Sequence, residues 1–121
     1  MDEQFKKALE FSNYRHTFSI QRRTLKEKIE SKLVYGFNGG IFKIDRELIS
    51  FVQILIDQGR INGIPLIDMN ENPVMIDDLT EFRDEIIDRY FTTTLEYYEQ
   101  YEALKRNRSV EKLLDLWKKV H

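Results

Sequence analysis

The sequence has no cysteine, only two prolines and only five glycines among its 121 residues. Without cysteine, the chain can form no disulfide bond, no zinc–thiolate site and no thiol nucleophile. Proline and glycine are both absent from residues 1–35, so a helix can run through that segment without a break. The fold must therefore rest on a buried apolar core, which a chain of this length can form without disulfides or metals.

A long apolar run is also missing. The most apolar stretch, residues 48–56, is interrupted by Ser50 and Gln53. It is much shorter than the roughly 20 residues that a membrane-spanning helix needs. The N-terminus is acidic and then amphipathic, whereas a secretory signal peptide starts with basic residues and continues with an unbroken apolar segment. These features predict a soluble, intracellular protein with no membrane partner.

The charge is small in sum but unevenly distributed. A net charge of -2 gives no overall attraction to nucleic acid, and we do not expect a nucleic-acid partner. Residues 1–36 carry eight Lys or Arg against five Asp or Glu, whereas residues 61–90 carry two Arg against eight acids. Such segments can attract each other within one chain or between chains, and they are also typical of solvated faces.

Two long helices are predicted from apolar residues that recur at steps of three, four and seven. The first covers residues 5–33, and the second starts after Asp78, with Glu81 completing a capping-box-like start. The second helix carries two neighbouring apolar stripes. One stripe is Leu79, Phe82, Ile86, Tyr90, Tyr97, Tyr101 and Leu104. The other stripe is Ile87, Phe91, Leu95 and Tyr98. Together they form an apolar face wider than one helix of the same chain is expected to cover.

Two β-hairpins and a third helix are predicted between the long helices. Asn38-Gly39 supplies the positive φ angles of a hairpin turn, and a second hairpin joins residues 64–68 to residues 74–77. The helix between the hairpins starts after Asp45 and ends near Gly59. It is apolar nearly all round, which predicts that it is the most buried element.

The predicted fold class is therefore α+β, in a single domain of residues 1–121. It consists of two long antiparallel helices plus a central buried helix, two short β-hairpins forming a small antiparallel sheet, and a short C-terminal helix after Ser109.

Asp68-x-Asn70-x-Asn72 has the spacing with which a calcium loop begins. Such a loop needs glycine at its sixth position and glutamate at its twelfth, where this chain has Pro73 and Leu79. We therefore expect these polar side chains to bind backbone groups of a hairpin turn. No metal site is predicted.

Catalytic groups are not predicted either. His16 and His121 have no positioned partner in the sequence, and the acidic pair Asp84 and Asp88 is typical of a solvated helix face. The chain is predicted not to be an enzyme and to need no cofactor. A deep pocket with converging ionisable side chains would reverse this interpretation.

Aromatic residues near the C-terminal end are the most unusual feature. They are common both in cores and in protein interfaces, because each buries a large area at a small cost in side-chain entropy. The candidate interface residues are Tyr90, Phe91, Tyr97, Tyr98, Tyr101 and Trp117. We expect some of them in the core and some in an interface.

Six segments, in this order, resemble a small protein of T-even-type contractile-tailed phages that is similar to the minor prohead core proteins. The segments are LEFSNY (9–14), QRR (21–23), FNGGIFK (37–43), LISF (48–51), LIDMNENP (66–73) and RSVEKL (108–113). The resemblance implies a non-enzymatic prohead core or scaffold component in the host cytoplasm, the prohead or the virion. It implies other phage structural proteins as partners and a homo-oligomer. The alternative is a small adaptor or inhibitor that binds a host or phage protein through the acidic surface of residues 68–88.

Overall fold

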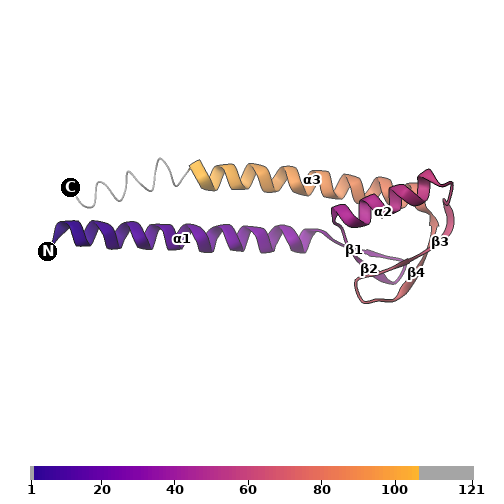
Figure 1. The fold of residues 1–121 in the computed structure, drawn as a ribbon, viewed down its shortest axis with the longest axis horizontal. Helices are drawn as coiled ribbons and strands as arrows, with labels where there is room; N and C mark the ends of the chain where they lie inside the picture. The colour runs from indigo at the N-terminus through magenta and orange to yellow at the C-terminus, as the bar shows by residue number, and fades with distance from the viewer. Residues whose placement is uncertain (1, 107–121) are drawn as a thin grey trace. The chain divides into compact units, whose positions relative to one another are not determined.

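The structure is a computed structural model that describes residues 2–106 (Figure 1). Its elements, in chain order, are α1 (Glu3–Lys32), β1 (Val34–Phe37), β2 (Gly40–Lys43), α2 (Arg46–Asp57), β3 (Asn62–Ile67), β4 (Pro73–Asp78) and α3 (Leu79–Arg106). The described residues divide into two compact units: residues 29–95 form one, and residues 2–28 with residues 96–106 belong to the other. No helix within residues 2–106 is long and apolar enough to cross a bilayer.

Residues 2–106 form an α+β structure with three helices and two small antiparallel sheets, and the predicted architecture is wrong. The prediction of two long helices around a central buried helix fails at α2, the central helix. This helix buries only Val52 and leaves Phe51 and Ile54 half exposed. The hairpins form two separate sheets, β1 with β2 and β3 with β4. The predicted C-terminal helix lies outside the described residues.

The first hairpin has the turn that its sequence predicts. Asn38 and Gly39 have φ angles of 49° and 83°, as a two-residue type I′ turn requires. Val34 lies opposite Lys43 at the open end of the ladder. The Asn38 side chain also donates a hydrogen bond of 2.9 Å to the carbonyl oxygen of Met75, so the turn is attached to β4.

The second hairpin accommodates two prolines without losing ladder hydrogen bonds. Pro73 is the first residue of β4, and Pro65 lies opposite Met75 in β3, which has a strand neighbour on one side only. Proline cannot donate a backbone hydrogen bond, so it is found at strand starts and on edge strands. Both positions follow this rule.

Local capping sets both ends of α2. The Asp45 carboxylate accepts a hydrogen bond of 2.8 Å from the amide of Leu48. At the other end, Gly59 has a φ of 78°, its amide donates to the carbonyl of Ile56, and the Arg60 amide donates to the carbonyl of Leu55. This pair of bonds is a Schellman motif, which glycine favours because the position needs a left-handed conformation.

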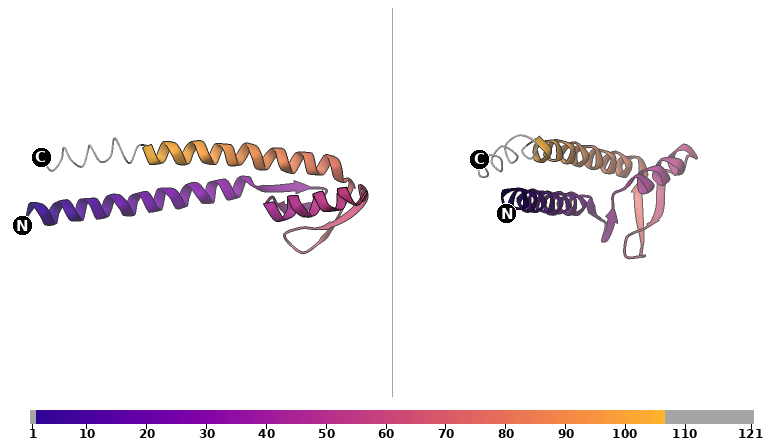
Figure 2. Two further views of the ribbon diagram at one scale, coloured as in Figure 1. Left: turned by 45° about the horizontal axis from the view of Figure 1, so that its top comes forward. Right: turned by 60° about the vertical axis from the view of Figure 1, so that its left-hand side comes forward.

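One apolar core organises residues 29–95. Its members come from β2, α2, β3, β4 and the first turns of α3, which lie together in both views of Figure 2. They are Phe42, Ile44, Val52, Leu66, Val74, Ile76, Leu79, Phe82 and Ile86. Phe82 ties the first hairpin to α3, because its ring lies 5.2 Å from that of Phe42 and 5.4 Å from that of Phe37, both in near-perpendicular contacts.

In the other unit, residues 3–28 of α1 have side chains shielded from solvent along only one narrow side of the helix. Tyr14 and Phe18 are half-buried and Leu25 is buried, whereas Phe5 and Leu9 are more than half exposed. The apolar pattern predicted the helix correctly over this segment. It did not distinguish the covered apolar residues from the uncovered ones.

We expect Gly40→Ala to destabilise the fold by about 1–3 kcal/mol, because the added methyl group would clash with the buried Val74 side chain. Gly36→Ala, in the paired strand, is the matched control. A methyl group there would meet its nearest atom, the Gly40 carbonyl oxygen, at 3.9 Å, and we expect a change within about 0.5 kcal/mol. Urea denaturation of both variants measures the difference. Equal stabilities would contradict the close packing at Gly40.

Candidate functional site

A row of large apolar side chains is exposed along α3. Ile87, Phe91, Leu95 and Tyr98 follow one another at steps of four, four and three, which return to the same side of a helix. They leave 40 to 68 % of their surface exposed. Single exposed apolar residues are normal in proteins, but a contiguous row marks a contact surface. We call these four residues the outer α3 stripe.

The packing of α3 explains why this stripe is exposed. Phe82, Ile86 and Thr93 are buried, and Tyr90 between them is partly buried against the core. These residues also follow one another at helical steps, so they define a second side of α3. Because the core covers only that side, the outer α3 stripe is left to solvent.

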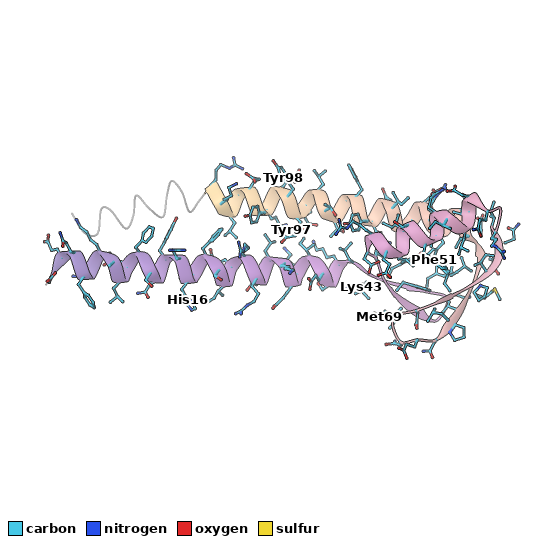
Figure 3. The ribbon with its side chains drawn as sticks, in the orientation of Figure 1. His16, Lys43, Phe51, Met69, Tyr97 and Tyr98 are labelled. Atoms are coloured by element: carbon cyan, nitrogen blue, oxygen red, sulfur yellow. The ribbon has the colours of Figure 1, made fainter. Side chains whose placement is uncertain are left out.

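The five predicted interface residues within residues 2–106 therefore divide between two sides of α3. Phe91 and Tyr98 belong to the outer α3 stripe and are its most exposed members, at 68 and 63 %. Figure 3 shows Tyr97 and Tyr98 leaving α3 on opposite sides. Trp117 lies outside the described residues.

The other three candidates are partly protected. Tyr90 packs against the core of residues 29–95. The rings of Tyr97 and Tyr101 meet edge to face, with centroids 6.5 Å apart, and both residues are half-buried. Their rings stabilise the fold of this chain, so they are not the exposed part of the candidate surface.

Acidic side chains border the outer α3 stripe. Asp84 lies one turn before Ile87, and Asp88 lies one turn before Phe91. Both aspartates are exposed. A stripe with this border favours a partner whose apolar surface is accompanied by positive charge.

The two arginines of residues 61–90 neutralise this border only in part, because Arg83 pairs with Asp84 and Arg89 pairs with Glu85. Arg83 lies 3.0 Å from Asp84, and Arg89 lies 2.6 Å from Glu85. The guanidinium group of Arg89 also lies over the Tyr35 ring, 4.2 Å from its centroid. Residues 61–90 contain eight acids and only these two bases, so the segment keeps an excess of negative charge.

A groove between α2 and the two hairpins is the second candidate site. It has a volume of about 410 Å³, and its walls include Lys43 of β2, Phe51 of α2 and Met69 after β3, which Figure 3 labels. Phe51, Ile67 and Met69 are each at least half exposed. The lining is mainly apolar, which suits an apolar ligand group better than a charged one.

Asp68 lines this groove, and both oxygens of its carboxylate accept hydrogen bonds from backbone amides. Its Oδ2 atom accepts a hydrogen bond of 2.9 Å from the Ile41 amide, and its Oδ1 atom accepts bonds of 3.0 and 2.9 Å from the amides of Asn70 and Asn72. These bonds, that from Ile41 first, hold the pKa of the carboxyl below its usual value. The backbone-binding role predicted for this segment is therefore confirmed for the Asp68 side chain.

The same loop joins the two hairpins. Beside the Asp68 contact, the Met69 amide donates a hydrogen bond of 2.9 Å to the Ile41 carbonyl oxygen. Ile41 thus has both of its outward backbone groups satisfied by the loop after β3, although the two hairpins do not share a ladder.

The ionisable side chains that line the groove are Lys43, Asp45, Glu47 and Asp68. In the groove, Asp68 and Asp45 both accept backbone hydrogen bonds, so neither is a free carboxylate. Across residues 2–106, no three His, Cys, Asp or Glu side chains lie close enough together to hold a metal ion. His16 is exposed on α1, outside the unit that holds the groove.

Sequence reasoning missed several exposed residues. Ile87 and Leu95 were not among the interface candidates, although their spacing from Phe91 already placed them on its stripe. Phe51 and Met69 had no such signal, because Phe51 belongs to α2, which was expected to be buried, and the loop position of Met69 carries no periodicity.

No known protein family, curated protein or solved structure matches the chain. The outer α3 stripe and the groove are therefore the features that bear on its function.

We expect Asp68→Asn to destabilise the fold near neutral pH, because an amide offers one acceptor oxygen to three backbone donors and points its NH₂ group at one of them. The pKa of Asp68 is lower in the folded state than its ordinary value of 3.8. The ionised carboxylate therefore stabilises the fold above that value, and this stabilisation is lost as pH falls through the folded pKa.

The measurement is urea denaturation of wild type and variant near pH 7 and near pH 3. The difference in free energy of unfolding should be larger near pH 7 and should shrink near pH 3. Asp77→Asn, at an exposed position, is the control and should change stability little at either pH. A difference that stays constant with pH would contradict the role given to the Asp68 carboxylate.

Proposed function

We propose that this chain is a non-enzymatic assembly protein of a contractile-tailed phage, a prohead core or scaffold component that works through protein–protein contacts. The observation that carries the proposal is the outer α3 stripe, in which Ile87, Phe91, Leu95 and Tyr98 remain exposed on one side of one helix. Covering such a surface stabilises a complex by about 25 cal/mol for each Å² of apolar area removed from water.

The composition of the stripe supports a protein partner. Tyrosine and phenylalanine are enriched in protein interfaces, and Tyr98 and Phe91 are the two most exposed large apolar residues of α3. The acidic border repels phosphate groups, which argues against nucleic acid at this surface.

The phage assignment is supported by the resemblance of six segments to a small protein of T-even-type phages, which is associated with the minor prohead core proteins. With that assignment, the partners are further copies of this chain and other phage structural proteins. The site of action is the host cytoplasm, the prohead or the virion.

The double variant Phe91→Ser with Tyr98→Ser should lose association while keeping its fold, because both side chains are exposed. Ile54→Ser is the matched control, since Ile54 is a similarly exposed large apolar residue on α2, does not line the groove and should leave association unchanged. Light scattering across micromolar concentrations measures molar mass. A wild-type protein that stays at 14.6 kDa and binds no purified phage structural protein would contradict the proposal.

A second candidate function, an adaptor or inhibitor, is supported by the acidic surface of residues 68–88. Asp77, Asp84 and Asp88 are all exposed there, as is Asp78. Asp78 also caps α3, accepting hydrogen bonds of 3.0 and 3.2 Å from the amides of Thr80 and Glu81, so it cannot be exchanged without cost to the helix.

We expect the triple variant Asp77→Lys, Asp84→Lys and Asp88→Lys to weaken an adaptor-type complex by tenfold or more, and more strongly at low salt. The measurement is titration against a host or phage protein that the wild-type chain binds. Asp57→Lys, on α2, is the control for a single exposed charge elsewhere. An unchanged affinity in the triple variant would rule out the acidic surface as the binding site.

A further inference from the structure

Two strand edges border the groove between α2 and the hairpins, and the proposed function uses neither of them. β2 and β3 belong to separate sheets, so their outer edges do not share a ladder. The edge of β2 meets the loop after β3 at one point, where the Met69 amide donates to the Ile41 carbonyl oxygen. Beside that point the groove opens, and both Lys43 of β2 and Ile67 of β3 line it.

The alternation of hydrogen bonds along an antiparallel ladder shows which backbone groups of β3 face outward. The Asp68 amide donates to the Asn72 carbonyl oxygen, on the side of β4. Ile67, one residue earlier, therefore directs its amide and its carbonyl away from β4, and Pro65 directs its carbonyl the same way. Within residues 2–106, these three groups have no hydrogen-bond partner. The outer edge of β3 thus offers one donor and two acceptors.

The wall beside this open edge is apolar. Leu66, between Pro65 and Ile67, is buried in the core that Val52 of α2 also enters, so the Leu66 side of β3 faces α2. Leu48 and Phe51 of α2 line the groove on this side, and Phe51 is 51 % exposed. A segment placed along the open edge can therefore bury an apolar side chain against α2.

The ionisable side chains of the groove are mainly acidic. The carboxylates of Asp45, Glu47 and Asp68 line it, against the single ammonium group of Lys43. This excess of negative charge favours an occupant that carries lysine or arginine. It disfavours phosphate groups and anionic headgroups.

We infer that the groove binds an extended peptide segment of a partner protein, apolar and basic in composition, which pairs with the open edge of β3 as an added strand. The outward groups of Ile67 and Pro65 supply the backbone pairing, and the apolar wall of α2 covers a side chain, as is typical of strand addition at a sheet edge. The site shares no residue with the outer α3 stripe. The inference therefore goes beyond the proposed function and does not depend on it.

Strand geometry fixes what each residue of the bound segment does. A residue opposite Ile67 or Pro65 bonds its backbone to β3 and points its side chain away from α2. The residue between those two lies opposite Leu66, and its side chain faces α2. The bound segment therefore alternates: an apolar side chain enters the groove, and the amides of its two neighbours bond to β3.

The probe is a short fluorescent peptide in which valine and threonine alternate between two terminal lysines. Fluorescence anisotropy measures its binding to the full chain. N-methylation of the threonine amides should abolish binding, because these amides donate to the carbonyl oxygens of Ile67 and Pro65. N-methylation of the valine amides is the matched control and should leave binding intact, since those amides point away from β3. If the two methylated peptides bind equally well, the added-strand geometry is overturned.

The charge preference is tested with glutamate in place of both lysines. This peptide should bind more weakly than the probe, and the difference should shrink as salt is added. Tighter binding of the glutamate peptide overturns the basic character given to the occupant.

Ile67→Pro removes the one amide donor of the open edge without removing a ladder hydrogen bond, as Pro65 already does two residues earlier. We expect this variant to bind the probe about twofold to tenfold more weakly, the range for one hydrogen bond. Ile67→Val keeps the amide and should bind as the wild type does. Circular dichroism verifies the fold of both variants, and the methylated peptides decide the question if Ile67→Pro does not fold.

Phe51→Ser should weaken binding of the probe by about tenfold, because the apolar wall is lost. Ile54→Ser is the matched control on α2, since Ile54 is equally exposed but does not line the groove. Equal binding by these two variants overturns the location of the site.

Laurate is the competing probe for the same apolar wall. If laurate binds with the same dependence on Phe51 and the peptide does not bind at millimolar concentration, the inference is overturned in favour of a small amphiphile. A chain that binds neither probe overturns it as well. The variant Phe91→Ser with Tyr98→Ser should bind the peptide as the wild type does, so failure of this inference leaves the proposed function standing.

Discussion

The burial of one side of α3 is the constraint on which the rest of the structure depends. Leu79, Phe82 and Ile86 enter the core of residues 29–95, and both hairpins and α2 pack around them. When one side of a helix is buried in a core, its other side faces solvent. In most surface helices that side is polar, but in α3 it carries Phe91 and Tyr98, and this mismatch is what points to a partner.

At Ile41, the outer edge of β2 is bonded by a loop and not by a further strand. Ile41 turns its amide and carbonyl outward from β2, where a further strand would normally pair. The Asp68 carboxylate and the Met69 amide take those two bonds instead. A charged side chain thereby protects a strand edge that would otherwise be open to pairing with another chain.

The sequence by itself determined the local features: the Asn38-Gly39 turn, the Asp45 and Asp78 caps, and the backbone role of Asp68. Each depends on groups a few residues apart, so the residue type and its φ angle or side-chain oxygen suffice. Only the tertiary structure decided which apolar surfaces are covered. Periodicity shows that a side chain is apolar, but its burial depends on elements distant in the sequence. For that reason α2 is half exposed, the hairpins form separate sheets, and the predicted interface aromatics divide between two sides of α3.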